Sequence, residues 1–260
     1  MEYRVNGTTM QTVEIALNPG EAVYSQTHQM AWMSTNIEMN TNTGGGVFKA
    51  IKRAFTGSSF FITEYSPSSG RGLVAFASIF PGQILAKQLA AGESLICRKD
   101  SFLCAEHSVT LDLFFRKQIG AGLFGGEGFI LQKVTGPGTV FLDMSGEIVE
   151  KDLQAGDMLM VHVGHVGIQD QTVGFDIQMV PGFRNILFGG QGLFLATLTG
   201  PGKVILQSMP IANLAEELAR YLHPGESGGQ GGNMAGGVLG AVVGGLLNNS
   251  GGGGGSSIKW

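Results

Sequence analysis

Two histidines separated by two residues, His162 and His165, are the most obvious candidates for metal chemistry in this chain. Residues three apart on a strand point to opposite faces, so both imidazoles reach one ion only if Gly164 turns the chain. No third ligand stands close by in sequence. The pattern favours two ordinary histidines beside a turn, and we expect neither a metal nor a cofactor.

Two thiols, Cys97 and Cys104, are the next candidates, and two cysteines do not make a disulfide scaffold. When the internal repeats described below are aligned, Cys104 takes the place of Trp32 and Ile168. A free cysteine often behaves as a small buried apolar residue. The alignment therefore predicts packing rather than nucleophilic chemistry for Cys104.

Carboxylates recur at one position in three copies of the pattern Leu-x-x-Gly-acid-x-aliphatic, as Glu21, Glu93 and Asp157. Paired carboxylates can do general acid–base work. Here each acid follows a glycine directly before a predicted strand, so stabilising a turn is the simpler role. The phosphate-loop pattern Gly-x-x-x-x-Gly-Lys-Ser/Thr is missing. We therefore expect a protein that is not an enzyme.

Basic residues precede a Phe-x-Gly signature in each copy and form the one candidate binding patch. If three units surround a pseudo-threefold axis, these side chains gather at one end and bind an anion or a partner. A solvated loop face is the alternative. The candidate residues are Lys52, Arg53, Arg116, Lys117 and Arg184.

The elements that position all these residues belong to a threefold sequence repeat. The stretch 128–142 returns at 192–206 with an offset of 64, and the Leu-x-x-Gly-acid pattern recurs with offsets of 72 and 64. Short apolar runs between turn residues are typical of all-β proteins. The sequence predicts an all-β domain of three tandem β-units. Its Gly-Pro-Gly motifs predict type II turns with positive φ at Gly138 and Gly202.

One helix and a glycine-rich tail follow the repeats. Asn213 and Glu216 form a capping-box pattern. We expect residues 1–224 to form the β domain with this terminal helix, and residues 225–260 to be a disordered tail. Within the tail, residues 234–247 are uncharged and apolar but shorter than the ~20 residues that span a bilayer. They are either a linker or a weak membrane or self-association segment.

Composition limits the function classes. The net charge is −4 and charged residues make up 14% of the 260 residues, so a basic nucleic-acid footprint is absent. Residues 1–11 are polar and lack the apolar core of a signal peptide. We expect a cytoplasmic protein.

The repeated signatures together resemble uncharacterised prokaryotic proteins related to the altered-inheritance-of-mitochondria family. The resemblance rests on residues 123–129, 135–138 and 187–193, with the Leu-x-x-Gly-Glu pattern, and covers about residues 1–224. It implies a fold like the tryptophan RNA-binding attenuation protein, with three β-units forming a pseudo-trimer. It implies no catalytic residues.

These observations predict a binding or scaffold protein that acts through oligomers or membrane-associated partners. Protein partners or self-association are expected, with peripheral membrane contact through residues 234–247 and no nucleic acid. The alternatives are a nucleic-acid-binding protein, by fold analogy alone, and a small-molecule-binding β domain.

Overall fold

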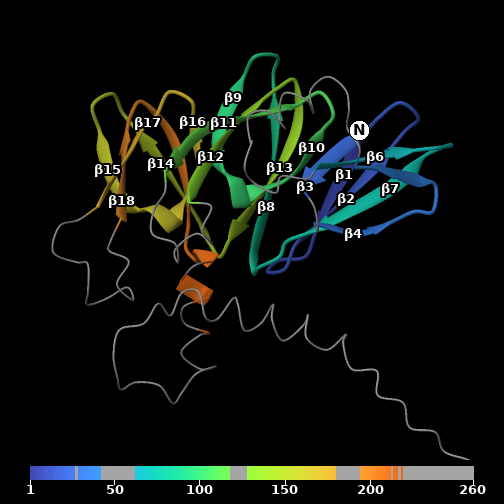
Figure 1. The fold of residues 1–260 in the computed structure, drawn as a ribbon, viewed down its shortest axis with the longest axis horizontal. Helices are drawn as coiled ribbons and strands as arrows, with labels where there is room; N and C mark the ends of the chain where they lie inside the picture. Colours follow the sequence, from blue (N-terminus) through green and yellow to red (C-terminus); the bar gives the residue numbers. More distant parts are fainter. Residues whose placement is uncertain are drawn as a thin grey trace, which may run out of the picture. The chain divides into compact units, whose positions relative to one another are not determined.

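The computed structural model describes residues 1–26, 29–41, 62–117, 128–179, 194–211, 213–215 and 218. The chain divides into two compact units, Met1–Leu214 and Ala215–Trp260. The described part of the first unit is almost entirely β, with a short helical stretch near its end (Figure 1). The all-β fold class is thereby confirmed. The predicted tail at 225–260 lies outside the described residues.

Strand β1 (Glu2–Asn6) precedes three successive sets of six strands. The first set is β2 (Thr12–Leu17), β3 (Val23–Gln26), β4 (Met30–Met33), β5 (Ile37–Asn40), β6 (Ile62–Pro67) and β7 (Gly72–Ala77). The second set is β8 (Gly82–Leu89), β9 (Ser94–Arg98), β10 (Phe102–Glu106), β11 (Thr110–Lys117), β12 (Phe129–Thr135) and β13 (Gly138–Ser145). The third set is β14 (Ile148–Leu153), β15 (Met158–His162), β16 (Val166–Asp170), β17 (Gly174–Met179), β18 (Phe194–Thr199) and β19 (Gly202–Gln207).

Each set pairs its strands in the same antiparallel pattern, and we call each set a unit. The sixth strand lies between the first and the third, which gives β2-β7-β4, β8-β13-β10 and β14-β19-β16. The fifth strand lies between the fourth and the second, which gives β5-β6-β3, β11-β12-β9 and β17-β18-β15. Each unit therefore contributes two three-stranded sheets.

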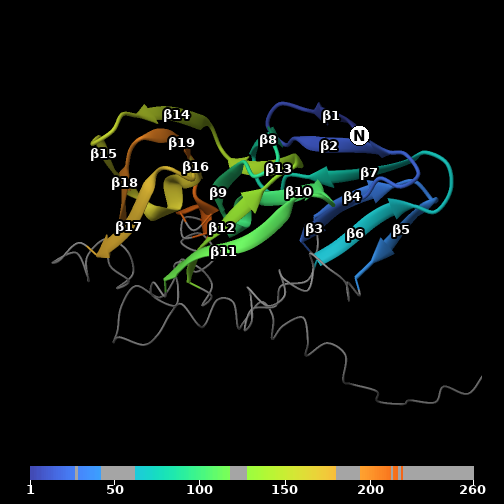
Figure 2. The ribbon, with the colours of Figure 1, turned by 90° about the horizontal axis from the view of Figure 1, so that it is seen from above.

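Neighbouring units are joined by strand pairing at two junctions. Strand β3 of the first unit pairs with β10 of the second, and β9 of the second pairs with β16 of the third. These pairs fuse three-stranded sheets into two six-stranded sheets. The three units follow one another in a row, with β4 and β7 at one end and β15 and β18 at the other (Figures 1 and 2).

The core is built across the junctions as well as within the units. Tyr24 of the first unit is fully buried among second-unit residues such as Phe102, and Ile96 of the second is fully buried among third-unit residues such as Val166. Strand β2 alternates half-buried and buried residues, the pattern of a strand with one face on the core. The cores of adjacent units are therefore continuous.

The Gly-Pro-Gly turns keep part of their predicted geometry. Gly138 and Gly202 have φ of 132° and 142°, which confirms positive φ at both. The type II geometry is wrong, because both values lie far above the roughly 80° that a type II turn has at this position. The Gly136–Pro137 and Gly200–Pro201 peptide bonds are cis. A Cβ on Gly136 would lie 2.5 Å from the Ala90 carbonyl oxygen, so the turn also needs glycine for close backbone approach.

Candidate functional site

The three recurring acids stabilise turns, as the repeats predict. The carboxylate of Glu21 accepts a hydrogen bond of 2.8 Å from the backbone N–H three residues earlier, and Glu93 and Asp157 accept the same bond at the same distance. The glycine before each acid has φ between 80° and 91°. In the second and third units the backbone oxygen of the acid accepts a bond from the Gly-Pro-Gly turn. Each unit therefore has one such carboxylate, which stabilises the same turn in all three units.

The two cysteines are both free and fully buried. Burial raises the pKa of the Cys97 thiol and the pKa of the Cys104 thiol, because a thiolate loses its hydration inside the protein. Packing of Cys104 agrees with the interpretation from the repeats, and Cys97 is packed in the same way. Both residues also lie at junctions, since Cys104 opposes Ser25 and Cys97 opposes Ile168.

The histidine pair flanks a short 3-10 turn, Val163–His165, so Gly164 does turn the chain. The two rings lie edge to face with centroids 5.8 Å apart. His165 Nδ1 donates a 2.8 Å hydrogen bond to the Gln207 carbonyl oxygen. Burial lowers the pKa of His162, which favours its neutral form. Among the described residues no group of three His, Cys, Asp or Glu side chains is placed to hold a metal ion.

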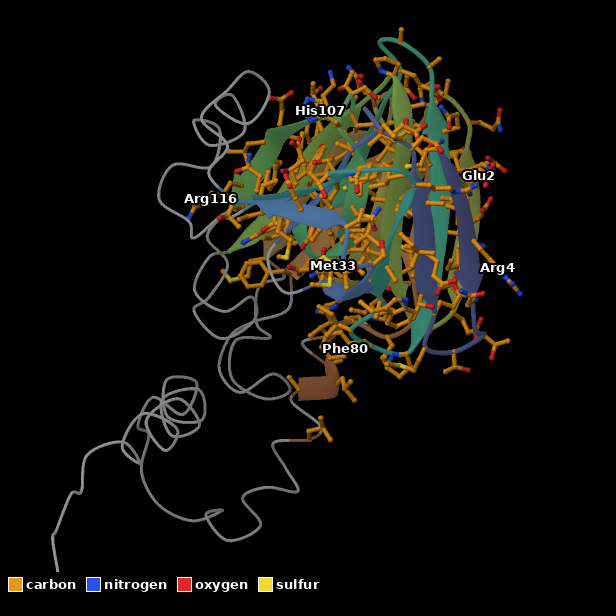
Figure 3. All side chains as sticks on the ribbon, turned by 90° about the vertical axis from the view of Figure 1, so that its right-hand side faces the viewer. Glu2, Arg4, Met33, Phe80, His107 and Arg116 are labelled. Carbon is orange, nitrogen blue, oxygen red and sulfur yellow. The ribbon has the colours of Figure 1, made fainter. Side chains whose placement is uncertain are left out.

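The predicted basic patch is described only in part. Arg116 and Lys117 are exposed on β11, and Lys117 Nζ donates to the Ile177 carbonyl oxygen of the third unit. Figure 3 shows Arg116 at the side of the molecule, away from Arg4. The other three candidates lie outside the described residues, namely Lys52, Arg53 and Arg184. The patch therefore stays a prediction. The Phe-x-Gly signatures also lie outside the described residues.

The described surface does show one unexpected feature, the apolar side chains on β4 and β15. We call these two strands the end strands. Met158 and Met160 on β15 are 69% and 64% exposed, the highest fractions among large apolar side chains of the described chain. On β4, Trp32 is 44% exposed and Met33 is half-buried. Figure 3 looks onto the first-unit end and places Met33 in the middle of the view.

Both end strands have one unpaired edge within the described chain. Strand β4 pairs with β7 alone, and β15 pairs with β18 alone. The counterparts of β4 in the other units are β10 and β16, and the counterparts of β15 are β3 and β9. All four of these strands pair on both edges. The end strands are thus the positions where the junction pattern of the repeat has no partner.

The sequence contained a signal for this site that residue chemistry did not select. The repeat alignment places Trp32 with Cys104 and Ile168, two residues that are fully or almost fully buried. Trp32 is therefore a large aromatic residue that is exposed at a position where its counterparts are buried. The alignment alone did not show that this position lies at a junction.

Comparison with known proteins places the chain in a family. Residues 3–209 match the model of the family described as Mitochondrial biogenesis AIM24. The chain belongs to this family. The resemblance inferred from the sequence is confirmed at the level of this AIM24 family.

The chain is also similar to proteins of Streptococcus pyogenes. An uncharacterised protein of serotype M6 is 34% identical over 219 residues, which is 81% of this chain and 86% of that protein. A crystal structure of a Streptococcus pyogenes protein, determined by a structural genomics consortium, matches with a TM-score of 0.69 and 28% identity. The match covers 85% of this chain and 99% of the crystallised one.

Proposed function

We propose that this protein is a non-enzymatic binding or scaffold protein that acts through its own oligomers or through membrane-associated partners. The observation that carries the proposal is the pair of end strands. Each has one edge whose backbone groups pair with no strand of the described chain, beside exposed apolar side chains. Natural proteins usually cover or charge such an edge, because an open edge is a template for pairing with another chain.

The row of three joined units supports a scaffold for a further reason. Six-stranded sheets run through both junctions, and apolar clusters cross from unit to unit. Such a tandem holds its two ends at fixed positions relative to one another. A rigid body with binding surfaces at two ends is suited to linking other molecules.

Analytical ultracentrifugation of the full chain over a wide concentration range tests this function. We expect species larger than the 27.3 kDa monomer, in an equilibrium that shifts with concentration. Co-sedimentation with liposomes, measured in a second series, tests the membrane partner. A chain that stays monomeric throughout and does not sediment with liposomes would contradict the proposal.

The membrane part of the proposal rests on residues 234–247, which lie outside the described residues. No helix within the described part of the chain is long and apolar enough to cross a bilayer. We propose a cytoplasmic location with peripheral membrane contact by the 234–247 segment. Truncation after Gly225 should reduce co-sedimentation with liposomes and leave the melting temperature unchanged, since the apolar clusters of the described chain all lie before residue 207.

Nucleic acid is the alternative partner that the fold resemblance suggests. With a net charge of −4, we predict no tight RNA or DNA binding, because such binding depends on neutralising phosphates. A fluorescence polarisation titration at physiological salt checks this. Tight binding that weakens steeply with added salt would favour the nucleic-acid alternative.

A further inference from the structure

The two junctions use one register. In the first junction Tyr24 opposes Ala105, and in the second Ile96 opposes Gln169. All four residues are buried, none more than 1% exposed. The counterpart of Tyr24 and Ile96 in the third unit is Met160, and the counterpart of Ala105 and Gln169 in the first unit is Met33. These two methionines lie on the end strands β15 and β4.

The residue at the Tyr24 position enters the core of the next unit. The Tyr24 ring stacks on the Phe102 ring with centroids 5.6 Å apart, and its hydroxyl donates a 3.0 Å hydrogen bond to the Val109 carbonyl oxygen. At the second junction Ile96 shares one buried cluster with Val166. In each case an apolar side chain of the second strand of one unit lies against the start of the third strand of the next.

The end strands carry side chains suited to the same contact. Met160 is 64% exposed on β15, and the counterpart of Phe102 and Val166 on β4 is Met30, which is half-buried at the edge of the first-unit core. Methionine adapts its shape to irregular apolar surfaces. Strand β15 therefore carries the residues for one side of a third junction, and β4 carries the residues for the other side.

We propose that β15 of one copy pairs antiparallel with β4 of a second copy of this chain, in the register of the internal junctions. Val161 then opposes Trp32, Met160 opposes Met33, and Leu159 opposes Ser34. This inference rests on the proposed function and names the partner and the surface. The pairing buries Met160 and part of Trp32, and it satisfies the open backbone edges of both strands.

The partner is a second copy because one chain does not bring its own end strands together. Figures 1 and 2, which are views at right angles, both place β15 and β4 at opposite ends of the row of units. The contact joins two different surfaces, so each copy keeps one free end. Such head-to-tail contacts produce a closed ring or an open filament.

Cysteine cross-linking between two variants tests the register. The Met160→Cys protein is mixed with the Met33→Cys protein under mild oxidation, and each is also oxidised alone. Opposed residues of an antiparallel pair have Cα atoms about 4.5–5.5 Å apart, within disulfide range. We expect a disulfide-linked dimer from the mixture and little from either variant alone, since the native Cys97 and Cys104 are buried.

A mixture of Met160→Cys with Met39→Cys is the matched control, because Met39 is 46% exposed on β5 and lies outside the proposed contact. Equal cross-linking of Met39→Cys and Met33→Cys would mean random collision and would overturn the proposal. Oligomers without the expected cross-link would overturn the register while leaving the proposed function standing. A strictly monomeric protein that binds no liposomes would overturn both.

A charge at the same position gives an independent measurement. In Met160→Lys we expect the dissociation constant of the oligomer to rise about tenfold or more, because an ammonium group would be buried without a partner. Met10→Lys is the control, since Met10 is 52% exposed and lies outside the end strands. Circular dichroism checks that both variants remain folded. An unchanged dissociation constant in Met160→Lys would contradict the proposed contact.

Discussion

The internal junctions and the two ends of the molecule use the same strand positions and differ in what covers them. At the junctions β3 meets β10 and β9 meets β16, and the opposed side chains are buried. At the ends, β4 and β15 have no partner in the described chain and expose tryptophan and methionine. The backbone pattern of the repeat is therefore complete inside the molecule and open at its ends.

The difference in residue type matches the difference in environment. The junction positions are occupied by side chains packed in a core, such as the Tyr24 ring, which stacks on Phe102. The end positions hold Met30, Met33 and Met160, whose flexible side chains tolerate contact with water and adapt to a surface that arrives later. One strand position thus lies in the core in two units, and we propose that it forms an interface in the third.

Truncating the apolar side chain at equivalent positions should give the largest difference between a junction and an end strand. Ile96→Ala removes a fully buried side chain at a junction, and we expect it to lower the free energy of unfolding by about 2–5 kcal/mol. Met160→Ala should change it by less than about 0.5 kcal/mol in the monomer, because Met160 is mostly exposed. Denaturant unfolding at low protein concentration measures both. Equal losses would show that the ends are not open.

A glycine pair in the third unit sharpens the contrast between packed corners and free edges. Gly202 has φ of 142°, and a Cβ there would lie 2.7 Å from Val173 Cγ2. Gly202→Val should therefore destabilise by about 1–3 kcal/mol. Gly174 begins the edge strand β17, and a Cβ there meets nothing closer than 3.4 Å. Gly174→Val should be nearly neutral in thermal melts, and a larger loss than that of Gly202→Val would contradict this account.

The turn acids give the smallest effect and a test of pH dependence. The backbone N–H of Asn18 donates to Glu21, and this bond lowers the pKa of the Glu21 carboxyl below its ordinary value of 4.5. A group whose pKa is lower in the folded state adds stability above its unfolded pKa, and this is lost as pH falls through the folded pKa. Glu21→Gln should cost about 0.5–1.5 kcal/mol near neutral pH.

The difference between wild type and Glu21→Gln should shrink as the pH is lowered past 4.5. Urea unfolding of both proteins at neutral and at acidic pH measures it. Ala22→Ser, a neighbouring change that leaves the carboxylate in place, is the control. A difference that grew on acidification would contradict the stabilising hydrogen bond.

Much of the fold could be predicted from the sequence, because the repeat marks backbone requirements. Gly138 and Gly202 need positive φ, and Glu93 and Asp157 cap identical turns, so these positions recur in register. The cis peptide bonds before Pro137 and Pro201 were not predicted, since the same Gly-Pro-Gly letters fit both geometries.

The open ends could not be predicted, because they depend on which strands pair between units. Alternation of apolar and polar residues indicates strands but not their neighbours across a sheet. Trp32 looked like an ordinary apolar strand residue until the structure placed its counterpart Cys104 at a junction. The basic candidates on β11, Arg116 and Lys117, were selected by charge, and charge does not mark the ends of this molecule.

Hydrogen–deuterium exchange of the full chain at two protein concentrations tests the central claim most directly. At high concentration we predict slower exchange in β4 (Met30–Met33) and β15 (Met158–His162) together, because their free edges become hydrogen-bonded. Two other edge strands, β5 and β17, should exchange at the same rate at both concentrations. Exchange in β4 and β15 that does not depend on concentration, or protection of one end strand without the other, would contradict the claim.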